Sequence, residues 1–469
     1  MLSTNVGIGG GGAVQLIPRL ITISDVNIMQ TVLVGGIATG EIVIERGNLP
    51  PEITWEITGN SIAFTGSRSS EYVSGQFRVR INRGGRSSQL TITVNLSPQE
   101  AMGFEWDFSN PSPSLLRLGG AAGLTATAGI GTVAGYSDFD KMPIYEGIRR
   151  CNLRQSNGSI AAWEGEPEFA FAPPLGIDVM TRIPKFYYRV EVEGTRYRYW
   201  VSPVPADGFL LHPAFARPGG NLEEFYIGSY EAMRTVGTGA VLRSISGVAP
   251  LVNHSRTNSR IDVRLKGAGW QIQDFAARVA VTTLMIVEFA NLNTQSVIAP
   301  GNTSSTTSLH TGRTNNIVGT GREAGTANQV SFVWRGIESW WGNVWEWVDG
   351  VNRNGAALWV STNPAHFADG TSTNHTQLDF AIPSTSGFLT RLGFDANNSW
   401  AAFPNVATGG SETTFLCDNG WFTGAGWRAA RVGGAWGDAG QAGAFAWAVS
   451  DAAAATNVGI GTRLMYLPQ

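Results

Sequence analysis

Near the carboxyl end the chain reads Gly426-Trp427-Arg428-Ala429-Ala430-Arg431-Val432-Gly433-Gly434-Ala435-Trp436, and it closes with Ile460-Gly461-Thr462-Arg463-Leu464. Residues typical of a stiff framework alternate in this region with positions that hold a narrow set of small or short polar residues. We interpret the first group as scaffold and the second as interchangeable surface whose side chains point outward. The second group comprises Ala435, Gly437, Asp438, Gly440, Ala446, Ala448, Ser450, Asp451, Ala453, Ala454, Asn457 and Gly459.

The composition favours strands and loops over helices. The chain has 469 residues, which is typical of two to four domains, and includes 59 glycines and 16 tryptophans. Charged residues make up 15% of the chain, well below the ~25% of an average soluble protein. The net charge is −3 and the chain has no basic block. A nucleic-acid partner is therefore not expected, because it would require a positive surface.

The cysteine count and the apolar runs exclude several protein classes. Cys151 and Cys417 are the only cysteines, which excludes a disulfide framework and a four-cysteine zinc site. We favour two separate buried thiols over one bridge between them. The first residues show neither a basic nor an apolar region of a signal peptide. Because no apolar run reaches ~18 residues, membrane insertion is not expected.

The amino-terminal part is predicted to be an immunoglobulin-like β-sandwich. Residues 1–12 form a glycine-rich leader, and residues 13–97 alternate apolar and polar residues in short runs separated by turn signals. This period of two is typical of antiparallel strands. A hairpin loop is expected at Asn82-Arg83-Gly84-Gly85. Prolines and glycines then mark residues 98–125 as a linker.

The remaining segment, 126–469, is predicted to form one larger domain with long loops. Apolar residues at helical spacing predict a helix over 271–292. Strands are expected at 182–192 and 197–202, joined as a hairpin across Glu193-Gly194. The whole chain is thus expected to be mostly β, of the α+β class.

Several motifs in 106–469 resemble a known group of proteins. The motifs are Trp106-Asp107-Phe108-Ser109-Asn110-Pro111, Ile183-Pro184-Lys185-Phe186-Tyr187-Tyr188, Tyr226-Ile227-Gly228-Ser229-Tyr230-Glu231-Ala232, Gly267-Ala268-Gly269-Trp270, Trp341-Gly342-Asn343-Val344-Trp345-Glu346-Trp347, Arg431-Val432-Gly433-Gly434 and Ile460-Gly461-Thr462-Arg463. In these motifs the chain resembles the phage tail-tip proteins that diversity-generating retroelements target, whose carboxyl-terminal domain has a C-type lectin fold of the formylglycine-generating-enzyme kind.

This resemblance implies a C-type lectin-like domain over 126–469 with a variable region at about 426–464. It implies a receptor-binding protein of the virion tail tip, made in the bacterial cytoplasm. Its partners would be a host surface receptor, protein or glycan, and other tail proteins, and the protein would be a homotrimer. In that family a reverse transcriptase miscopies adenines, so that asparagine codons scatter over a restricted set of residues. All twelve residues of the narrow set belong to that restricted set.

An enzyme is not expected. The formylglycine-generating relatives use a pair of reactive thiols, whereas Cys417 is the only cysteine in the carboxyl-terminal half. The five histidines are scattered, and no nucleophile–base pair or metal-binding pattern is present. No cofactor is therefore predicted. Asp349, Asp369 and Asn374 could bind a structural calcium ion in a loop, although calcium requires six to eight convergent oxygens and the sequence shows no such convergence.

Two alternatives to diversified receptor binding stay open. The chain could be an invariant structural tail or baseplate protein with a lectin-like decoration domain, or a calcium-dependent lectin of fixed specificity. Framework roles are expected for Trp341, Trp345 and Trp347 as core, for Glu346 as a hydrogen-bonding hub, and for Arg428, Arg431 and Arg463 as residues that pin loops. Since the narrow set is poor in the residues that dominate interfaces, ligand binding would also depend on neighbours such as Trp421 and Phe422.

Overall fold

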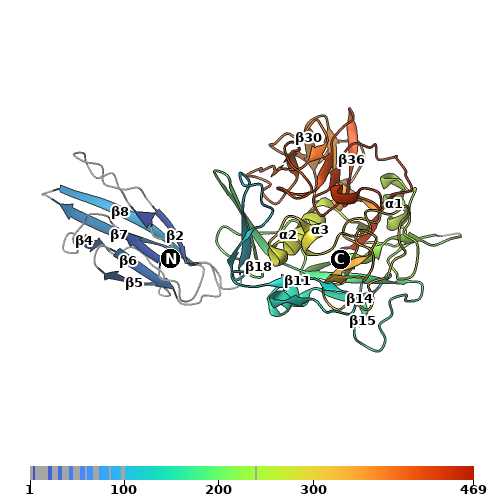
Figure 1. Cartoon of the computed structure of the whole chain (residues 1–469), viewed down its shortest axis with the longest axis horizontal. Helices are drawn as coiled ribbons and strands as arrows, with labels where there is room; N and C mark the ends of the chain where they lie inside the picture. The colour runs from blue at the N-terminus through green and yellow to red at the C-terminus, as the bar shows by residue number, and fades with distance from the viewer. Residues whose placement is uncertain are drawn as a thin grey trace. The chain divides into compact units, whose positions relative to one another are not determined.

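The computed structural model describes residues 101–237 and 240–469 and, within residues 1–100, the strands named below. The chain divides into two compact units. Unit 1 contains residues 1–103, 118–122 and 200–210, and unit 2 contains residues 104–117, 123–199 and 211–469. Strands far outnumber helices along the described chain (Figure 1), which confirms the predicted mostly-β class.

The amino-terminal strands form two four-stranded sheets. One has the order β1-β3-β6-β5 and the other β2-β8-β7-β4. Their bounds are β1 (Thr4–Asn5), β2 (Arg19–Ile23), β3 (Gln30–Leu33), β4 (Ile42–Glu45), β5 (Ile53–Thr58), β6 (Ser61–Gly66), β7 (Val73–Arg83) and β8 (Arg86–Leu96). The expected hairpin is confirmed by the pairing of Arg83 with Arg86. The immunoglobulin-like arrangement stays a prediction.

Residues 98–125, predicted to be a linker, contain regular structure. Strand β9 (Met102–Asp107) has Phe104 and Trp106 buried, and β10 (Leu116–Gly119) follows it. Strand β9 neighbours β18 (Arg196–Ser202), which pairs with β17 (Tyr187–Glu193). The prolines between β9 and β10 mark a turn between strands, so the linker prediction is wrong for 102–107. The hairpin across Glu193-Gly194 is confirmed.

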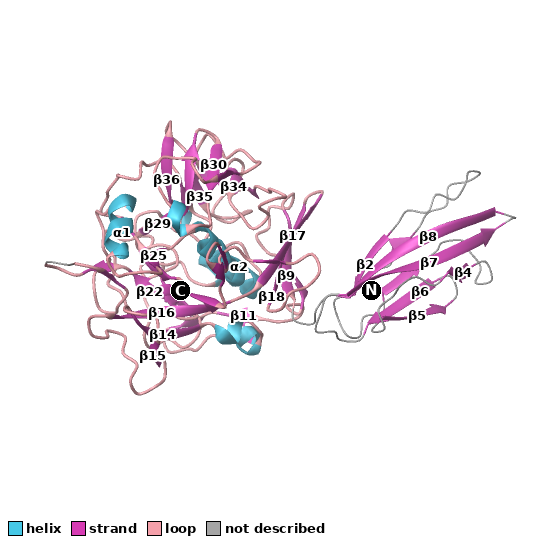
Figure 2. Cartoon of the chain, turned by 180° about the vertical axis from the view of Figure 1, so that it is seen from behind, coloured by secondary structure: helices cyan, strands magenta, loops and turns pink. Residues whose placement is uncertain are grey.

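Helix α2 (Phe275–Phe289) lies at the centre of unit 2. All fifteen of its residues are buried, and in Figures 1 and 2 it lies between the sheet that contains β36 and the sheet that contains β14. It begins later than predicted because Asp274 caps it: the Asp274 carboxylate accepts a hydrogen bond from the Ala277 amide at 2.8 Å. The preceding residues form strand β25 (Trp270–Ile272) instead.

The two largest sheets of the described chain lie in unit 2 (Figure 2). The first has the order β15-β14-β16-β22-β39-β25, with β14 (Arg149–Arg154), β15 (Ile160–Trp163), β16 (Ile177–Pro184), β22 (Glu224–Glu231) and β39 (Arg463–Tyr466). The second has the order β31-β30-β29-β36-β37-β35-β32, with β38 paired to β29. Its strands are β29 (Trp345–Asn354), β30 (Ala357–Val360), β31 (Thr376–Gln377), β32 (Gly387–Phe388), β35 (Asn419–Trp421), β36 (Trp427–Val432), β37 (Trp447–Ala448) and β38 (Ile460–Gly461).

Short elements connect these sheets. Helices α1 (Arg256–Arg264) and α3 (Thr294–Val297) accompany α2. The short strands are β11 (Ala126–Thr127), β12 (Gly129–Ile130), β13 (Tyr136–Ser137), β19 (Leu210–Leu211), β20 (Ala216–Arg217), β21 (Gly220–Asn221), β23 (Met233–Arg234), β24 (Leu242–Arg243), β26 (Gly321–Arg322), β27 (Phe332–Trp334), β28 (Ile337–Glu338), β33 (Arg391–Leu392) and β34 (Pro404–Val406). Among the described helices, none has the length and apolar character needed to cross a bilayer.

Candidate ligand-display site

The register of the second sheet sorts its residues between two faces. Arg431 of β36 lies opposite Trp347 of β29 and Ala448 of β37, and Ala448 lies opposite Trp421 of β35. Side chains of directly opposed residues share a face of a sheet. The other face carries Trp447, whose ring lies 5.5 Å from that of Phe275 in α2. The face with Arg431 is therefore turned away from the helix.

Trp345, Trp421 and Arg431 gather on this face, and Trp436 packs against the same apolar core; we call these four residues the Trp345 cluster. The Trp345 and Trp421 rings meet edge to face at 5.0 Å, and the Arg431 guanidinium lies 5.0 Å from the Trp345 ring centre. Arg431 Nη2 also binds Asp451 Oδ2 at 2.9 Å, with 17% of the Arg431 side chain and 35% of the Asp451 side chain exposed. Arg431 thus pins the 450–459 loop, as predicted, and burial lowers its pKa.

A tight turn after β36 borders the Trp345 cluster on one side. The Ala435 amide donates to Asp438 Oδ2 at 2.7 Å, and the Asp438 amide donates to the Ala435 carbonyl at 3.2 Å. Burial raises the pKa of Asp438, while the Ala435 amide, the Arg431 charge and a hydrogen bond from Trp345 lower it. The Trp436 amide donates to the Asn343 carbonyl at 3.1 Å, which fastens the turn to the scaffold.

The 450–459 loop borders the Trp345 cluster on another side. Asn457 Oδ1 accepts a hydrogen bond from the Gly459 amide at 2.8 Å, and the Gly459 carbonyl accepts one from the Trp345 amide at 2.8 Å. A Cβ added to Gly459 would lie 3.4 Å from the Ala435 Cβ and 3.8 Å from Trp436 Nε1. This loop and the 435–438 turn therefore meet at Gly459.

The structure brings most of the narrow set together and leaves a few members apart. Gly437 and Ala454 are exposed, and Ser450 is half-buried beside Asp451. A Cβ added to Gly440 would lie 2.2 Å from Glu412 Oε2, so this residue belongs to a different contact. The members that border the Trp345 cluster, or pack in the same apolar core as it, are Ala435, Asp438, Ala446, Ala448, Asp451, Ala453, Asn457 and Gly459.

The expectation that all twelve side chains point into solvent is wrong for several members. Ala435, Ala446 and Ala448 are 7%, 0% and 1% exposed, and Gly459 is buried as well. Ala446 and Ala448 are two residues apart around Trp447, so both face away from α2 and toward the Trp345 cluster. Their small side chains pack beneath the larger rings. The exposed and half-exposed members lie in the turn and the loops.

Trp421 and Phe422, the two neighbours that the sequence suggested as ligand contacts, lie in different surroundings. Trp421 joins the Trp345 cluster, as expected. Phe422 is fully buried and packs 6.4 Å from Phe403 on the α2 side, so the expectation that it contacts ligand is wrong. Trp436, which was not named as a candidate ligand-binding residue, packs against the same apolar core as Trp345. An aromatic residue between two glycine-rich turns is the signal that could have pointed to it.

A network of ion pairs formed by two arginines of α1 lies next to the 450–459 loop. Arg260 binds Asp349 at 2.5 Å and Asp369 at 2.9 Å, and Arg256 binds Asp369 at 2.7 Å. The Arg256 amide donates to the Ala453 carbonyl at 3.0 Å, which ties α1 to the 450–459 loop. The two carboxylates considered for calcium are thus bound to arginine, so the residues present do not fit a calcium site. No acidic or histidine cluster able to hold a metal occurs in the described part of the chain.

The framework predictions for the three tryptophans, Glu346 and Arg463 agree with the structure, whereas Arg428 Nη1 donates to the carbonyl of its neighbour Trp427 at 2.9 Å and its role in pinning a loop stays a prediction. Trp341, Trp345 and Trp347 are 1%, 5% and 0% exposed. Glu346 accepts hydrogen bonds from Gln273 at 2.6 Å and from Arg463 at 2.8 Å, which confirms its role as a hub. Both thiols are free and buried, and burial raises the pKa of Cys151 and of Cys417 to about 12.

Comparison with known proteins yields structural neighbours only. No family model matches the chain, and no curated protein matches it. Among solved structures, the U1, M1 and P3c variants of a Major Tropism Determinant are similar to it at 10%, 10% and 11% identity. Each covers 85% of this chain and 83% of its own, with TM-scores of 0.25, 0.26 and 0.25. Similarity at this level decides nothing about the fold or the ligand of this chain.

Proposed function

We propose that the chain is a phage tail receptor-binding protein that displays a diversified ligand-binding surface around the Trp345 cluster. The observation that carries the proposal is that most residues of the narrow set lie around the Trp345 cluster. Residues of the narrow set come from the turn after β36, from β37 and from the 450–459 loop, and eight of the twelve border the Trp345 cluster or pack in the same apolar core. The motifs that resemble retroelement-target proteins support the same function.

The geometry suits a surface that varies while the fold is kept. Backbone hydrogen bonds from Arg256 to Ala453 and from Trp345 to Gly459 hold part of the 450–459 loop and do not depend on the side chains at Ala453 and Gly459. The side chains of Asp438, Asp451 and Asn457 also hold the turn and the loop, so variation without loss of stability is expected mainly at the other positions. Substitutions at exposed side chains usually change stability by only about 0.5 kcal/mol. The Trp345 cluster supplies the aromatic and arginine groups that typically contribute most to an interface.

The proposal includes the partners and location that the resemblance implies. The ligand is a receptor on the host cell, and the other partners are tail proteins of the virion. A homotrimer at the tail tip would present three copies of the site. Such multivalency raises the apparent affinity by roughly 10²–10⁴ without new contacts, which compensates for a variant whose exposed positions are mainly alanine and glycine.

The first test changes the accessible members of the narrow set. A triple variant, Gly437→Tyr with Ala453→Tyr and Ala454→Tyr, alters the surface next to the Trp345 cluster, and a Cβ at Gly437 meets no heavy atom within 4 Å. We expect the adsorption rate of phage carrying this variant to change by about tenfold or more, which corresponds to about 1.4 kcal/mol of binding free energy.

A matched control introduces three tyrosines at exposed positions outside the site. Val133→Tyr, Leu175→Tyr and Val318→Tyr alter residues that are 70%, 72% and 83% exposed, and this triple variant should adsorb like the unmodified phage. Equal adsorption by both triple variants and the unmodified phage would contradict the proposal.

A second test separates a diversified surface from an invariant tail protein. The DNA beside the gene should contain a near-copy of the segment that encodes 426–464, different only at adenines, together with a reverse transcriptase. Absence of both would favour the invariant structural protein, because the narrow composition would then have no mutational origin.

A further inference from the structure

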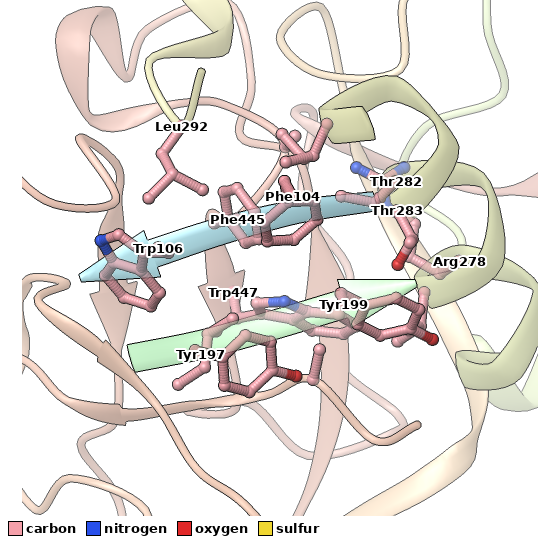
Figure 3. A pocket seen from close by; sticks show the side chains of 15 residues that line it. Phe104, Trp106, Tyr197, Tyr199, Arg278, Thr282, Thr283, Leu292, Phe445 and Trp447 are labelled. Atoms are coloured by element: carbon pink, nitrogen blue, oxygen red, sulfur yellow. The ribbon is translucent and has the colours of Figure 1, made fainter. Parts of the chain in front are cut away.

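The second sheet carries a pair of directly opposed arginines at one end. Arg353 of β29 lies opposite Arg428 of β36, and opposed residues of neighbouring strands share a face of the sheet. Because residues two apart also share a face, Arg428 lies on the same side as Val432, which is opposite Trp447. Beside α2 this side is apolar, and Trp447 and Phe445 line a small cavity there (Figure 3). At the end of β36 it becomes positively charged.

The charge of this arginine pair is not neutralised within the described chain. Asp451 is tied to the neighbouring residue, since its carbonyl accepts a hydrogen bond from the Ala429 amide at 2.8 Å. Its carboxylate, however, binds Arg431 at 2.9 Å, and no described carboxylate forms an ion pair with Arg353 or Arg428. Burial and then the charge of Arg428 lower the pKa of Arg353. Like charges opposed across two strands are unfavourable for folding.

Part of each guanidinium is free to bind another molecule. Arg353 Nη1 donates to the carbonyls of Thr423 and Val449 at 2.9 and 3.0 Å. Arg428 Nη1 donates to the Trp427 carbonyl at 2.9 Å. The Nη2 atoms of both arginines make no hydrogen bond with the described residues, and neither atom is enclosed by the protein. Arg428 as a whole is half-buried, so its guanidinium has an edge that faces solvent.

The exposed 423–426 loop links this pair to the display site. A Cβ added to Gly424 would lie 2.8 Å from Arg428 Nε, 3.3 Å from Arg428 Nη2 and 3.1 Å from the Ser450 carbonyl. Gly424 has a φ of +100°, which is accessible mainly to glycine, so the backbone packs directly against the guanidinium. Ser450 belongs to the narrow set and precedes Asp451. The arginine pair therefore borders the display site at the end of the sheet.

We infer that this pair, through Arg428 above all, binds an anionic oxygen group of the host receptor, a carboxylate or a phosphate. An arrangement that is unfavourable for folding is expected at a site of function, and guanidinium groups bind these anions through charge-assisted hydrogen bonds. An anion supplies the negative charge that is missing here, whereas a neutral ligand does not. The inference rests on the proposed receptor-binding function and adds the chemistry of the ligand to it.

The first experiment compares arginine variants of the full chain on phage. Arg428→Gln should lower the adsorption rate about tenfold, because a charge-assisted hydrogen bond is lost. Its rate should also depend less on sodium chloride between about 0.05 and about 0.5 M, since salt screens the attraction. Arg428→Lys keeps the charge and should restore most of the rate. The thermal midpoint of Arg428→Gln should not fall below that of the native chain, because the repulsion of Arg353 is relieved.

An arginine away from the site provides the matched control. Arg154 is exposed in β14 and donates to Ser159 Oγ at 3.3 Å and to the Ile160 carbonyl at 3.0 Å. Arg154→Gln removes the same charge from the chain, and phage that carry it should adsorb like the unmodified phage with the same salt dependence. A change in overall charge alone would instead lower adsorption equally in Arg154→Gln and Arg428→Gln, which would overturn the inference.

The outcomes separate this inference from the proposed function. Adsorption of the Arg428→Gln phage at the native rate would overturn the anion contact, while the triple tyrosine variant at 437, 453 and 454 still decides whether the surface binds a receptor. Native adsorption by both would contradict both proposals. A lower thermal midpoint of Arg428→Gln without rescue by lysine would assign Arg428 a role in folding and overturn the contact as well.

Treatment of the host cells distinguishes the two anions. Coupling glycinamide to surface carboxyl groups with a carbodiimide neutralises carboxylates and leaves phosphates charged. Equal adsorption of native and Arg428→Gln phage to treated cells would identify a carboxylate, and a native advantage that persists would identify a phosphate. Native phage whose adsorption to untreated cells does not depend on salt would contradict an anion of either kind, and this measurement requires no variant.

Discussion

At the scale of single residues, Arg463 of the Ile460-Gly461-Thr462-Arg463 motif stabilises the fold through buried hydrogen bonds and an ion pair. Arg463 is fully buried, binds Glu346 through two nitrogens, and donates to the carbonyls of Gly228, Glu338 and Ser339 at 2.9, 2.8 and 3.0 Å. One side chain thus connects β39, β22, β28 and β29. The residue type was visible in the sequence, but its partners lie more than a hundred positions away.

Replacement of this arginine should destabilise the fold strongly. Arg463→Met leaves Glu346 without its main partner, and breaking a buried ion pair in this way costs about 3–5 kcal/mol. Urea unfolding followed by tryptophan fluorescence measures the change. Arg313→Met is the control: the Arg313 side chain is 44% exposed in its ion pair with Glu323, and loss of a surface pair costs about 0–1 kcal/mol. Similar losses in both variants would contradict the assigned role.

A second residue makes stability depend on pH. Glu231 is 2% exposed, and burial followed by the charge of Glu346 raises the pKa of its carboxyl well above the usual value. The folded state then holds a proton that the unfolded state releases above about pH 4.5, so this carboxyl lowers the free energy of unfolding as pH rises. Glu231→Gln removes the titration and keeps an acceptor for Asn343, whose Nδ2 now donates to Glu231 Oε2.

We therefore expect Glu231→Gln to be more stable than the native chain at pH 7, with the difference disappearing near pH 4.5. Chemical unfolding across that range measures it. An advantage that is the same at both pH values would show that the carboxyl is ionised in the folded protein.

At the scale of elements, the alternation along β37 decides which narrow-set residues can vary in size. Trp447 faces α2, so Ala446 and Ala448 face the Trp345 cluster from below. The 450–459 loop, by contrast, is held at Ala453 and Gly459 through its backbone and leaves Ala454 exposed. The strand members and the loop members of the narrow set thus differ in their tolerance of large side chains.

This difference can be measured with one substitution at two positions. Ala448→Tyr inserts a ring into a packed site and should destabilise the fold by about 1–3 kcal/mol. Ala454→Tyr adds the same ring to an exposed position and should change stability by no more than about 0.5 kcal/mol. Thermal unfolding of the two variants compares them directly. Equal stability of the two variants would mean that the packing around Ala448 rearranges to accommodate a large side chain.

At the scale of the whole molecule, period-two alternation predicted the amino-terminal strands, and apolar spacing predicted the buried helix. Their boundaries were less accurate. The helix starts at Phe275 because the Asp274 side chain caps it and β25 precedes it, and the supposed linker holds the buried strand β9. Local sequence patterns cannot reveal the boundaries of these elements, because a strand such as β9 forms only where strands from distant parts of the sequence complete its sheet.

By itself, the sequence determined the mostly-β class, the buried tryptophans, the reduced thiols and the contrast between framework and narrow-set residues near the carboxyl end. Only the tertiary structure decided that β29, β36, β37 and β35 lie in register, that Trp421 and Arg431 share a face with Ala448, and that arginines bind the carboxylates considered for calcium. The physical reason is that exposure and ion pairing depend on neighbours contributed by segments far apart along the chain. Composition shows which residues could form a surface, and packing alone settles which of them solvent or a ligand can reach.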